Sequence, residues 1–332
     1  MSFELQPNQS VADGIRRIEI EQIDSALEQL TTKMSPETRD KSVHEARKSF
    51  KRLRAVARLV RDELGEEAYR REATAFRDVG RALSAARDAT VLVDALDALT
   101  ENVEPIELAQ SFAPLREILL QGSAQGEATL SPESLDRVVA DLQTARQRVA
   151  AWPLARDGWD PMERGLRRLY GAGRDAFEQA YRHPAFERFH EWRKRGKDLW
   201  HALELLSPIW PELMAPLADQ VHHLSDLLGD DHDLAILRQT IQDDPGTAAF
   251  RSAVDALVGL IEARRTQLQS EARILGRRLY CERPRRLMQR LQAYWDTWHT
   301  SHLPPKPVDP PPPVDLPLTL DPPAPGDMPL SI

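Results

Sequence analysis

Two stretches of the sequence carry a histidine followed by cations at the same spacing. The histidine and three cations of the first stretch return in the second, as His44, Arg47, Lys48 and Lys51 and then as His190, Arg193, Lys194 and Lys197. Positions three and four apart share one face of an α-helix, so each stretch predicts a row of positive charge beside an imidazole. Guanidinium and ammonium groups bind phosphoryl oxygens through charged hydrogen bonds. The chemistry that these rows offer is the binding of phosphate groups.

The first row extends along a whole predicted helix. On a helical wheel, residues 43–64 place their apolar side chains in one arc, and the cations of the neighbouring arc also include Arg54 and Arg58. Like charges four residues apart repel by roughly a few tenths of a kcal/mol per pair. The row therefore lowers the stability of its own helix, and we expect a partner outside the helix to compensate.

A third predicted helix, over residues 160–182, has the same design. Its arginines share one arc beside an apolar one: Arg164, Arg167, Arg168, Arg174 and Arg182. Three such helices packed side by side would line a groove or pore with cations, which suits a flexible polymer of phosphate groups. The alternative is a set of solvated helix faces whose cations pair with carboxylates of neighbouring helices. The two interpretations differ in whether the rows face one another or are already neutralised.

The second row is not a full copy of the first. Asp198 and Trp200 stand where the first row has Arg52 and Arg54, so the second row is basic over fewer turns. The surrounding cations disfavour protonation of the histidines, so we expect neutral imidazoles that donate to a phosphoryl or carbonyl oxygen.

Apolar residues recur at helical spacing from Val11 to about Trp298, and the alternation typical of strands is nearly absent. The pattern predicts an all-α fold. Proline, glycine and turn residues predict breaks at, among other places, residues 152–161 and His183-Pro184. Gly229 and the acidic residues after it predict a helix end followed by a new helix start.

The two rows belong to a longer internal repeat. Gly14-Ile15-Arg16-Arg17-Ile18 precedes the first row, as Gly165-Leu166-Arg167-Arg168-Leu169 precedes the second. Arg87-Asp88 follows the first row, as His232-Asp233 follows the second. We therefore predict a domain over residues 10–300 made of two pseudo-symmetric halves, about 10–150 and 158–298, each a four-helix bundle with extra helices.

Composition indicates a folded chain without membrane segments. The 332 residues are 41% hydrophobic and 29% charged, with a net charge of −8, so the basic rows are local features of an acidic chain. One cysteine and no apolar run long enough for a membrane helix lead us to expect a cytoplasmic protein. Residues 304–332 are rich in proline and predict a disordered, extended tail, which could be a ligand for a proline-recognising protein partner.

With these motifs in this order, the sequence resembles the CHAD family, named for conserved histidines in an α-helical domain. The resemblance extends to Leu169-Tyr170, Leu279-Tyr280 and Arg283-Pro284. It implies a basic surface and pore that bind inorganic polyphosphate without a cofactor, and association with polyphosphate granules. The residues expected to contact phosphate are His44, Arg47, Lys48, Lys51, Arg54, Arg58, Arg164, Arg167, Arg168, Arg174, His190, Arg193, Lys194, Lys197 and Arg283.

We expect a protein without enzymatic activity, since Glu19-Ile20-Glu21 lacks the lysine of the triphosphate-processing CYTH domain that often accompanies CHAD domains. Three alternatives stay open. A metal-dependent phosphohydrolase of the HD type would use His232-Asp233 with nearby polar residues: His222, His223, Asp226 and Asp230. A nucleic-acid-binding protein is disfavoured because the rows lack interleaved base-stacking aromatics. A purely structural scaffold would show no salt-sensitive binding of polyanions.

Overall fold

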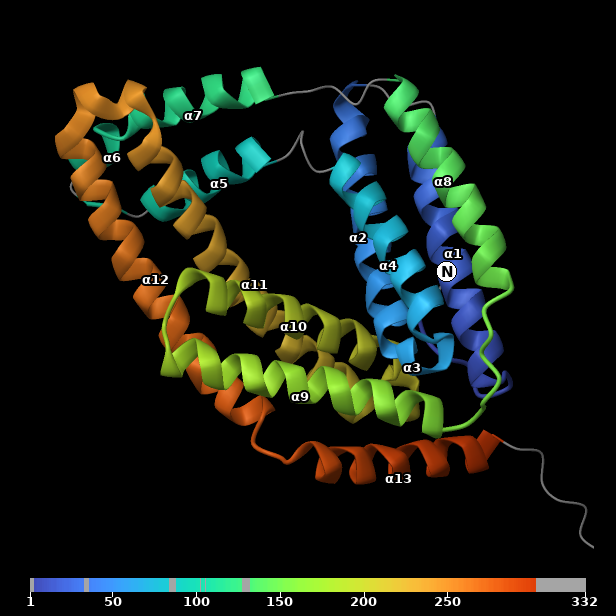
Figure 1. Cartoon of the computed structure of the whole chain (residues 1–332). Helices are drawn as coiled ribbons and strands as arrows, with labels where there is room; N and C mark the ends of the chain where they lie inside the picture. The colour runs from blue at the N-terminus through green and yellow to red at the C-terminus, as the bar shows by residue number, and fades with distance from the viewer. Residues whose placement is uncertain are drawn as a thin grey trace, which may run out of the picture. The chain divides into compact units, whose positions relative to one another are not determined.

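The computed structural model describes residues 3–32, 36–83, 88–101, 103–104, 106–126 and 132–302 (Figure 1). Every regular element within these residues is a helix, which confirms the all-α prediction. None of the described helices is long and apolar enough to cross a bilayer. The predicted tail and Arg87 lie outside the described residues.

The described residues up to 150 form eight helices. They are α1 (Val11–Thr31), α2 (Pro36–Leu59), α3 (Arg61–Leu64), α4 (Glu66–Ala82), α5 (Asp88–Thr100), α6 (Ile106–Gln110), α7 (Ala113–Gly126) and α8 (Pro132–Ala150). Helices α1, α2, α4 and α8 pack together as a four-helix group (Figure 1). Their apolar faces meet in a core that includes Ile18, Phe50, Phe76 and Leu142, all nearly inaccessible to solvent.

The second part forms five α-helices and two 3₁₀ turns. They are α9 (Asp160–Arg182), α10 (Phe186–Leu205), η1 (Ser207–Ile209), α11 (Pro211–Asp243), η2 (Pro245–Phe250), α12 (Arg251–Leu279) and α13 (Pro284–His302). Helices α9 to α12 form a second four-helix group, and α13 lies along α9 (Figure 1). The predicted breaks at residues 152–161 and at His183-Pro184 are confirmed.

One helix from the first part of the chain packs against the second four-helix group. Helix α5 belongs to the predicted first half, yet it packs against α11 of the second four-helix group as well as against α7. The structure thus has two four-helix groups, while the bounds of the two halves and the two-fold symmetry between them stay predictions.

Helix α11 corrects the break predicted at Gly229. It runs without interruption through this glycine, because buried leucines continue on both sides, from Leu224 and Leu228 to Leu234 and Leu237. Burial of that continuous apolar face outweighs the local preference of glycine and aspartate for a helix end. Residues 230–233 therefore lie within α11, where their side chains project around the helix.

Helices α2 and α10 cross in direct contact. Arg58 binds Asp198 and Arg52 binds Glu204, so residues six apart on each helix pair in opposite order. The N-terminal segment covers this crossing, since the Leu5 backbone N–H donates to the Leu205 carbonyl at 3.3 Å. Gly165 lets α9 approach the same region, because a Cβ there would lie 1.8 Å from the Leu59 carbonyl oxygen. The crossing brings the two basic rows to one place.

Candidate anion-binding site

Lys197 is the centre of a group of charges from three helices. Its partly buried ammonium lies on α10 within electrostatic range of Arg193, of Lys51 on α2, and of Asp226 and Asp233 on α11. Burial, followed by the charges of Arg193 and Lys51, lowers the pKa of Lys197 to about 7. An anion that binds beside this buried lysine would therefore stabilise the charged ammonium form.

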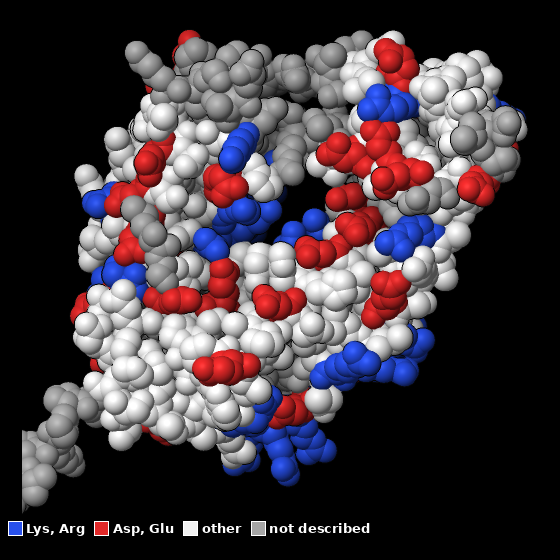
Figure 2. Space-filling view, turned by 180° about the vertical axis from the view of Figure 1, so that it is seen from behind, with Lys and Arg blue, Asp and Glu red and all other residues white. Residues whose placement is uncertain are grey.

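Figure 2 shows a hollow near the middle of one face, with Lys and Arg side chains in its wall and Asp and Glu side chains at its rim. Helices α2, α10 and α11 border the open space in the ribbon view (Figure 1). We call the group of Lys51, His190, Arg193, Lys197 and His232, which these helices carry, the basic cluster.

The repeated histidine of the second row pairs with the histidine of the His232-Asp233 step. His190 Nδ1 lies 3.2 Å from His232 Nδ1, and the His232 ring stacks on Phe186 at 5.2 Å between centroids and an angle of 14°. Burial and the charge of Arg193 lower the pKa of His232 to about 4. Burial and the charge of Lys194 also lower the pKa of His190. Both imidazoles are therefore neutral near pH 7.

Because both imidazoles are neutral, each ring carries a single N–H hydrogen-bond donor. One ring must carry hydrogen on Nδ1 and donate it to the bare Nδ1 of the other ring. The accepting ring then carries its hydrogen on Nε2, away from the pair. The two histidines together thus offer one N–H donor without adding charge, as expected for the neutral imidazoles predicted above.

Arg193 is held in place but lacks an acceptor. Its guanidinium lies over the backbone of α11, where a Cβ on Gly229 would be 3.5 Å from Nε. The Nε atom is buried without a hydrogen-bond partner, and within the described part of the chain the side chain forms no ion pair. Buried donors in proteins are nearly always satisfied. An anion that enters beside Lys197 would supply the missing acceptor.

Carboxylates on α11 place negative charge beside the basic cluster. We did not predict this from the sequence. Asp226, Asp230 and Asp233 recur at spacings of four and three, so they share a face of the continuous α11. Burial, with the charges of Asp233 and Asp226, raises the pKa of Asp230. The spacing was visible in the sequence, but the break predicted at Gly229 concealed the shared face.

Several other predicted residues of the two rows are already paired. Lys48 lies 3.1 Å from Glu45, and Lys194 lies 2.5 Å from Glu191, both within one helical turn. Arg54 remains part of the α2 row, and burial with the neighbouring Arg58 lowers its pKa. The other two members of the α2 row, His44 and Arg47, are partly exposed on this helix.

The third row, on α9, does not join the basic cluster. Arg167 binds Glu163, Arg168 binds Asp62 and donates to the Arg58 carbonyl at 2.8 Å, and Arg174 lies 3.5 Å from Glu178. Arg164 and Arg283 are exposed elsewhere, on α9 and after α12. Phosphate contact by these five residues stays a prediction, and the first three have carboxylate partners.

The metal-binding alternative needs several ligand side chains close together. Within the described ranges, no three His, Cys, Asp or Glu side chains lie close enough together to hold a metal ion. His232 is turned toward His190, and the His222 ring packs at a tilt of 31° against Trp200, with ring centroids 3.8 Å apart.

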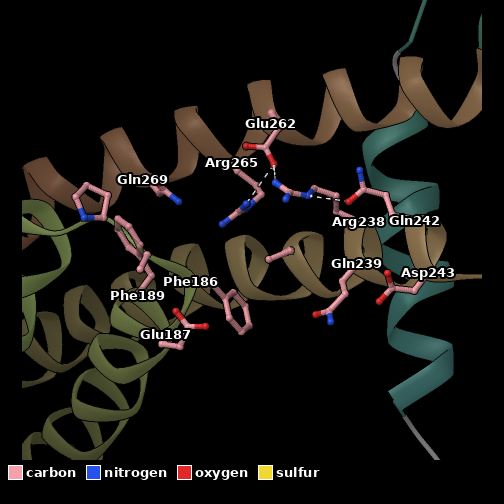
Figure 3. Close-up of a pocket in the computed structure, with 13 residues that line it drawn as sticks. Phe186, Glu187, Phe189, Arg238, Gln239, Gln242, Asp243, Glu262, Arg265 and Gln269 are labelled. Atoms are coloured by element: carbon pink, nitrogen blue, oxygen red, sulfur yellow. Dashed lines mark hydrogen bonds and ion pairs between the residues drawn. The ribbon is translucent and has the colours of Figure 1, made fainter.

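A separate cavity of about 560 Å³ lies between the start of α10, α11 and α12 (Figure 3). Its two arginines share one carboxylate, since Arg238 and Arg265 lie 2.5 Å and 3.3 Å from Glu262. Arg265 also lies 3.0 Å from the buried Asp231. Because these cations are neutralised within the wall, the cavity lacks the excess positive charge that a phosphate group requires.

A model of the CHAD domain matches residues 21–242. The chain belongs to the CHAD domain family. Among solved structures it is similar to the CHAD domain from the plant Ricinus communis, with a TM-score of 0.48 and 19% sequence identity. That similarity covers 81% of this chain and 94% of the plant chain. No curated protein sequence matches the chain.

Proposed function

We propose that this CHAD protein binds inorganic polyphosphate, with the basic cluster as its main contact and without turning the polymer over. One observation carries the proposal: Lys197 and Arg193 of α10 are gathered with Lys51 of α2, and the Arg193 Nε is buried without an acceptor. Membership of the CHAD family supports a role of this kind. Binding to the polymer would also bring the protein to polyphosphate granules.

A phosphate polymer would supply both the hydrogen-bond acceptors and the negative charge that the basic cluster lacks. Its oxygens accept from the Arg193 guanidinium, from the Lys197 ammonium and from the single outward N–H of the His190–His232 pair. Its repeated charge compensates the repulsion among cations from two helices. Binding alone is proposed because the His232-Asp233 step, which a metal-dependent hydrolase would use for ligands, serves the histidine pair.

The direct test is calorimetric titration of the full chain with long-chain polyphosphate. Arg193→Gln combined with Lys197→Gln should lower affinity at least about tenfold, because each charged hydrogen bond contributes roughly 1.5–3 kcal/mol. The matched control is Arg70→Gln with Arg137→Gln, which removes the same charge from exposed positions on α4 and α8. Equal affinity of the two double variants, both helical by circular dichroism, would remove the site assignment.

Two further measurements separate the alternatives. Release of orthophosphate from polyphosphate with added magnesium or manganese, abolished by His232→Ala, would favour the hydrolase. Displacement of bound polyphosphate by an RNA oligonucleotide at lower phosphate concentration than the reverse would favour a nucleic-acid ligand.

A further inference from the structure

The cavity between the start of α10, α11 and α12 carries an excess of negative charge (Figure 3). Three carboxylates and two guanidinium groups line it, and both guanidinium groups lie against the same carboxylate, that of Glu262. The other two carboxylates belong to Glu187 on α10 and Asp243 on α11, which are both exposed. Within the described part of the chain, neither of these two forms an ion pair. The cavity therefore attracts cations and repels anions.

The charges in the wall form a fixed and neutral network. Arg265 lies 3.0 Å from Asp231, whose side chain is only 1% exposed, and Gln269 Nε2 donates to the same carboxylate at 2.9 Å. Arg238 Nε donates to Gln242 Oε1 at 3.3 Å. Because partners within the wall already hold these side chains, a ligand meets a preorganised surface and little order has to be gained on binding.

Asp243 lies at an unfavourable position on its own helix. It is the last residue of α11, where the helix dipole places partial negative charge, and the last turn contains no basic residue. The carboxylate is repelled there by the carbonyl oxygens that a helix end leaves without helical partners. A cation bound at this end of the cavity would relieve the repulsion, whereas an anion would increase it.

An aromatic ring lies between the two exposed carboxylates. In Figure 3, Glu187 and Asp243 lie at opposite sides of the view, with Phe186 and Gln239 between them. The Phe186 ring is held in place because it stacks on His232, with centroids 5.2 Å apart and an angle of 14°. The face of an aromatic ring attracts an ammonium group, and an amide oxygen accepts a hydrogen bond from it.

The length of the cavity favours a linear ligand. His232, which stacks on the Phe186 ring, and Asp243 are eleven residues apart on α11, which corresponds to about 16 Å along the helix. A compact amine reaches the carboxylate at one end only. A flexible chain with an ammonium group at each end reaches both, and its methylene groups can lie along the apolar side chains of Phe186 and Ala235, which also line the cavity.

We propose that this cavity binds a linear aliphatic polyamine, with its ammonium groups at Glu187 and Asp243 and its methylene chain across Phe186. The volume of about 560 Å³ is that of a small-molecule site. The inference does not depend on the proposed function, because it concerns other residues and a ligand of the opposite charge. The negative charge that attracts the amine also keeps a phosphate polymer out of this cavity.

The test titrates the full chain with spermidine by calorimetry, in the absence of polyphosphate. The cavity variant carries Glu187→Gln and Asp243→Asn. The control variant carries Glu28→Gln and Asp219→Asn, which remove the same charge from exposed positions on α1 and α11. We expect the cavity variant to bind spermidine at least about tenfold more weakly than the control variant, because two charged hydrogen bonds are lost. Phe186→Leu should weaken binding by about two- to fivefold through loss of the ring face.

Three results would contradict the inference. Equal affinity of the cavity and control variants for spermidine, with both helical by circular dichroism, would show that the amine responds only to the net charge of −8. Methylamine binding as tightly as spermidine would show that no ligand bridges the two ends of the cavity. Tighter binding of succinate than of spermidine would show that the cavity selects anions.

Discussion

Lys197 makes binding sensitive to pH at the scale of one residue. Its pKa of about 7 means that it is largely charged at pH 6 and largely neutral at pH 8 before the ligand arrives. A bound polyphosphate favours the ammonium form and raises this pKa, so binding takes up a proton as pH rises through 7. Since one pKa unit corresponds to about 1.4 kcal/mol, we expect affinity to fall by up to about tenfold between pH 6 and pH 8.

Calorimetry in two buffers of different ionisation enthalpy measures that proton uptake directly. The pKa of His232 is lowered to about 4, so this histidine stays neutral over the range and does not contribute to the effect. Lys197→Arg keeps its charge and should bind with little change between pH 6 and pH 8. The same slope in Lys197→Arg as in the unchanged protein would assign the pH dependence to another group.

Single residues show where sequence reasoning succeeds and where it stops. Recurrence of the motif identified His190, Arg193 and Lys197, which the fold brings into one cluster. The pairing of Lys194 with Glu191 was also readable, because residues three apart on a helix are neighbours. The pairing of Arg58 with Asp198 was not, since the two residues are 140 positions apart and meet only through the crossing of their helices.

At the scale of elements, the crossing of α2 and α10 depends on charges that differ between the two rows. Arg52 and Arg58 in the first row align with Asp198 and Glu204 in the second, and these four residues form the two ion pairs. The departures from the repeat are thus the places where the helices bind each other. They hold Lys51 near Lys197, although the two ammonium groups repel.

Exchange of the Arg58–Asp198 charges tests this positioning role. Arg58→Asp alone leaves two buried carboxylates together, and breaking a buried pair costs roughly 3–5 kcal/mol, with the partial exposure of Arg58 favouring the lower end. Combining it with Asp198→Arg should restore most of the unfolding free energy in urea and most of the polyphosphate affinity. The exposed pair Arg146–Asp24 is the control, where exchange should leave the unfolding free energy nearly unchanged.

The double exchange also separates two roles for Arg58, which the basic row placed among the phosphate contacts. If Arg58 positions α2, the doubly exchanged protein binds as before. If Arg58 contacts phosphate directly, the doubly exchanged protein regains stability without regaining affinity.

Elements themselves were predictable wherever local and global preferences agree. Helical spacing of apolar residues gave α9 and α10 with the break between them at His183-Pro184. It failed at Gly229, where a local helix-end signal competes with a buried apolar face that continues across it. The packing of α5 against α11 could not be predicted from either helix. An apolar face predicts that a helix is buried, but it does not predict which other helix covers that face.

At the scale of the whole molecule, a net charge of −8 opposes a polyanion while a few cations attract it. Binding should therefore depend on the local contacts and on salt, not on net charge. For a single-stranded polyanion, the logarithm of affinity falls with the logarithm of salt concentration with a slope of about −0.7 per neutralised phosphate. Each cation that contacts the polymer thus contributes a fixed share of the measured slope.

Titrations of long-chain polyphosphate at several salt concentrations count those contacts. Removing Arg193 and Lys197 together should make the slope shallower by about 1.4, at a pH where Lys197 is charged. Removing two exposed arginines outside the proposed contacts, Arg70 and Arg137, should leave the slope unchanged while altering net charge equally. If both double variants shift the slope by the same amount, binding depends on the net charge of the protein. The assignment of the basic cluster as the contact would then be wrong.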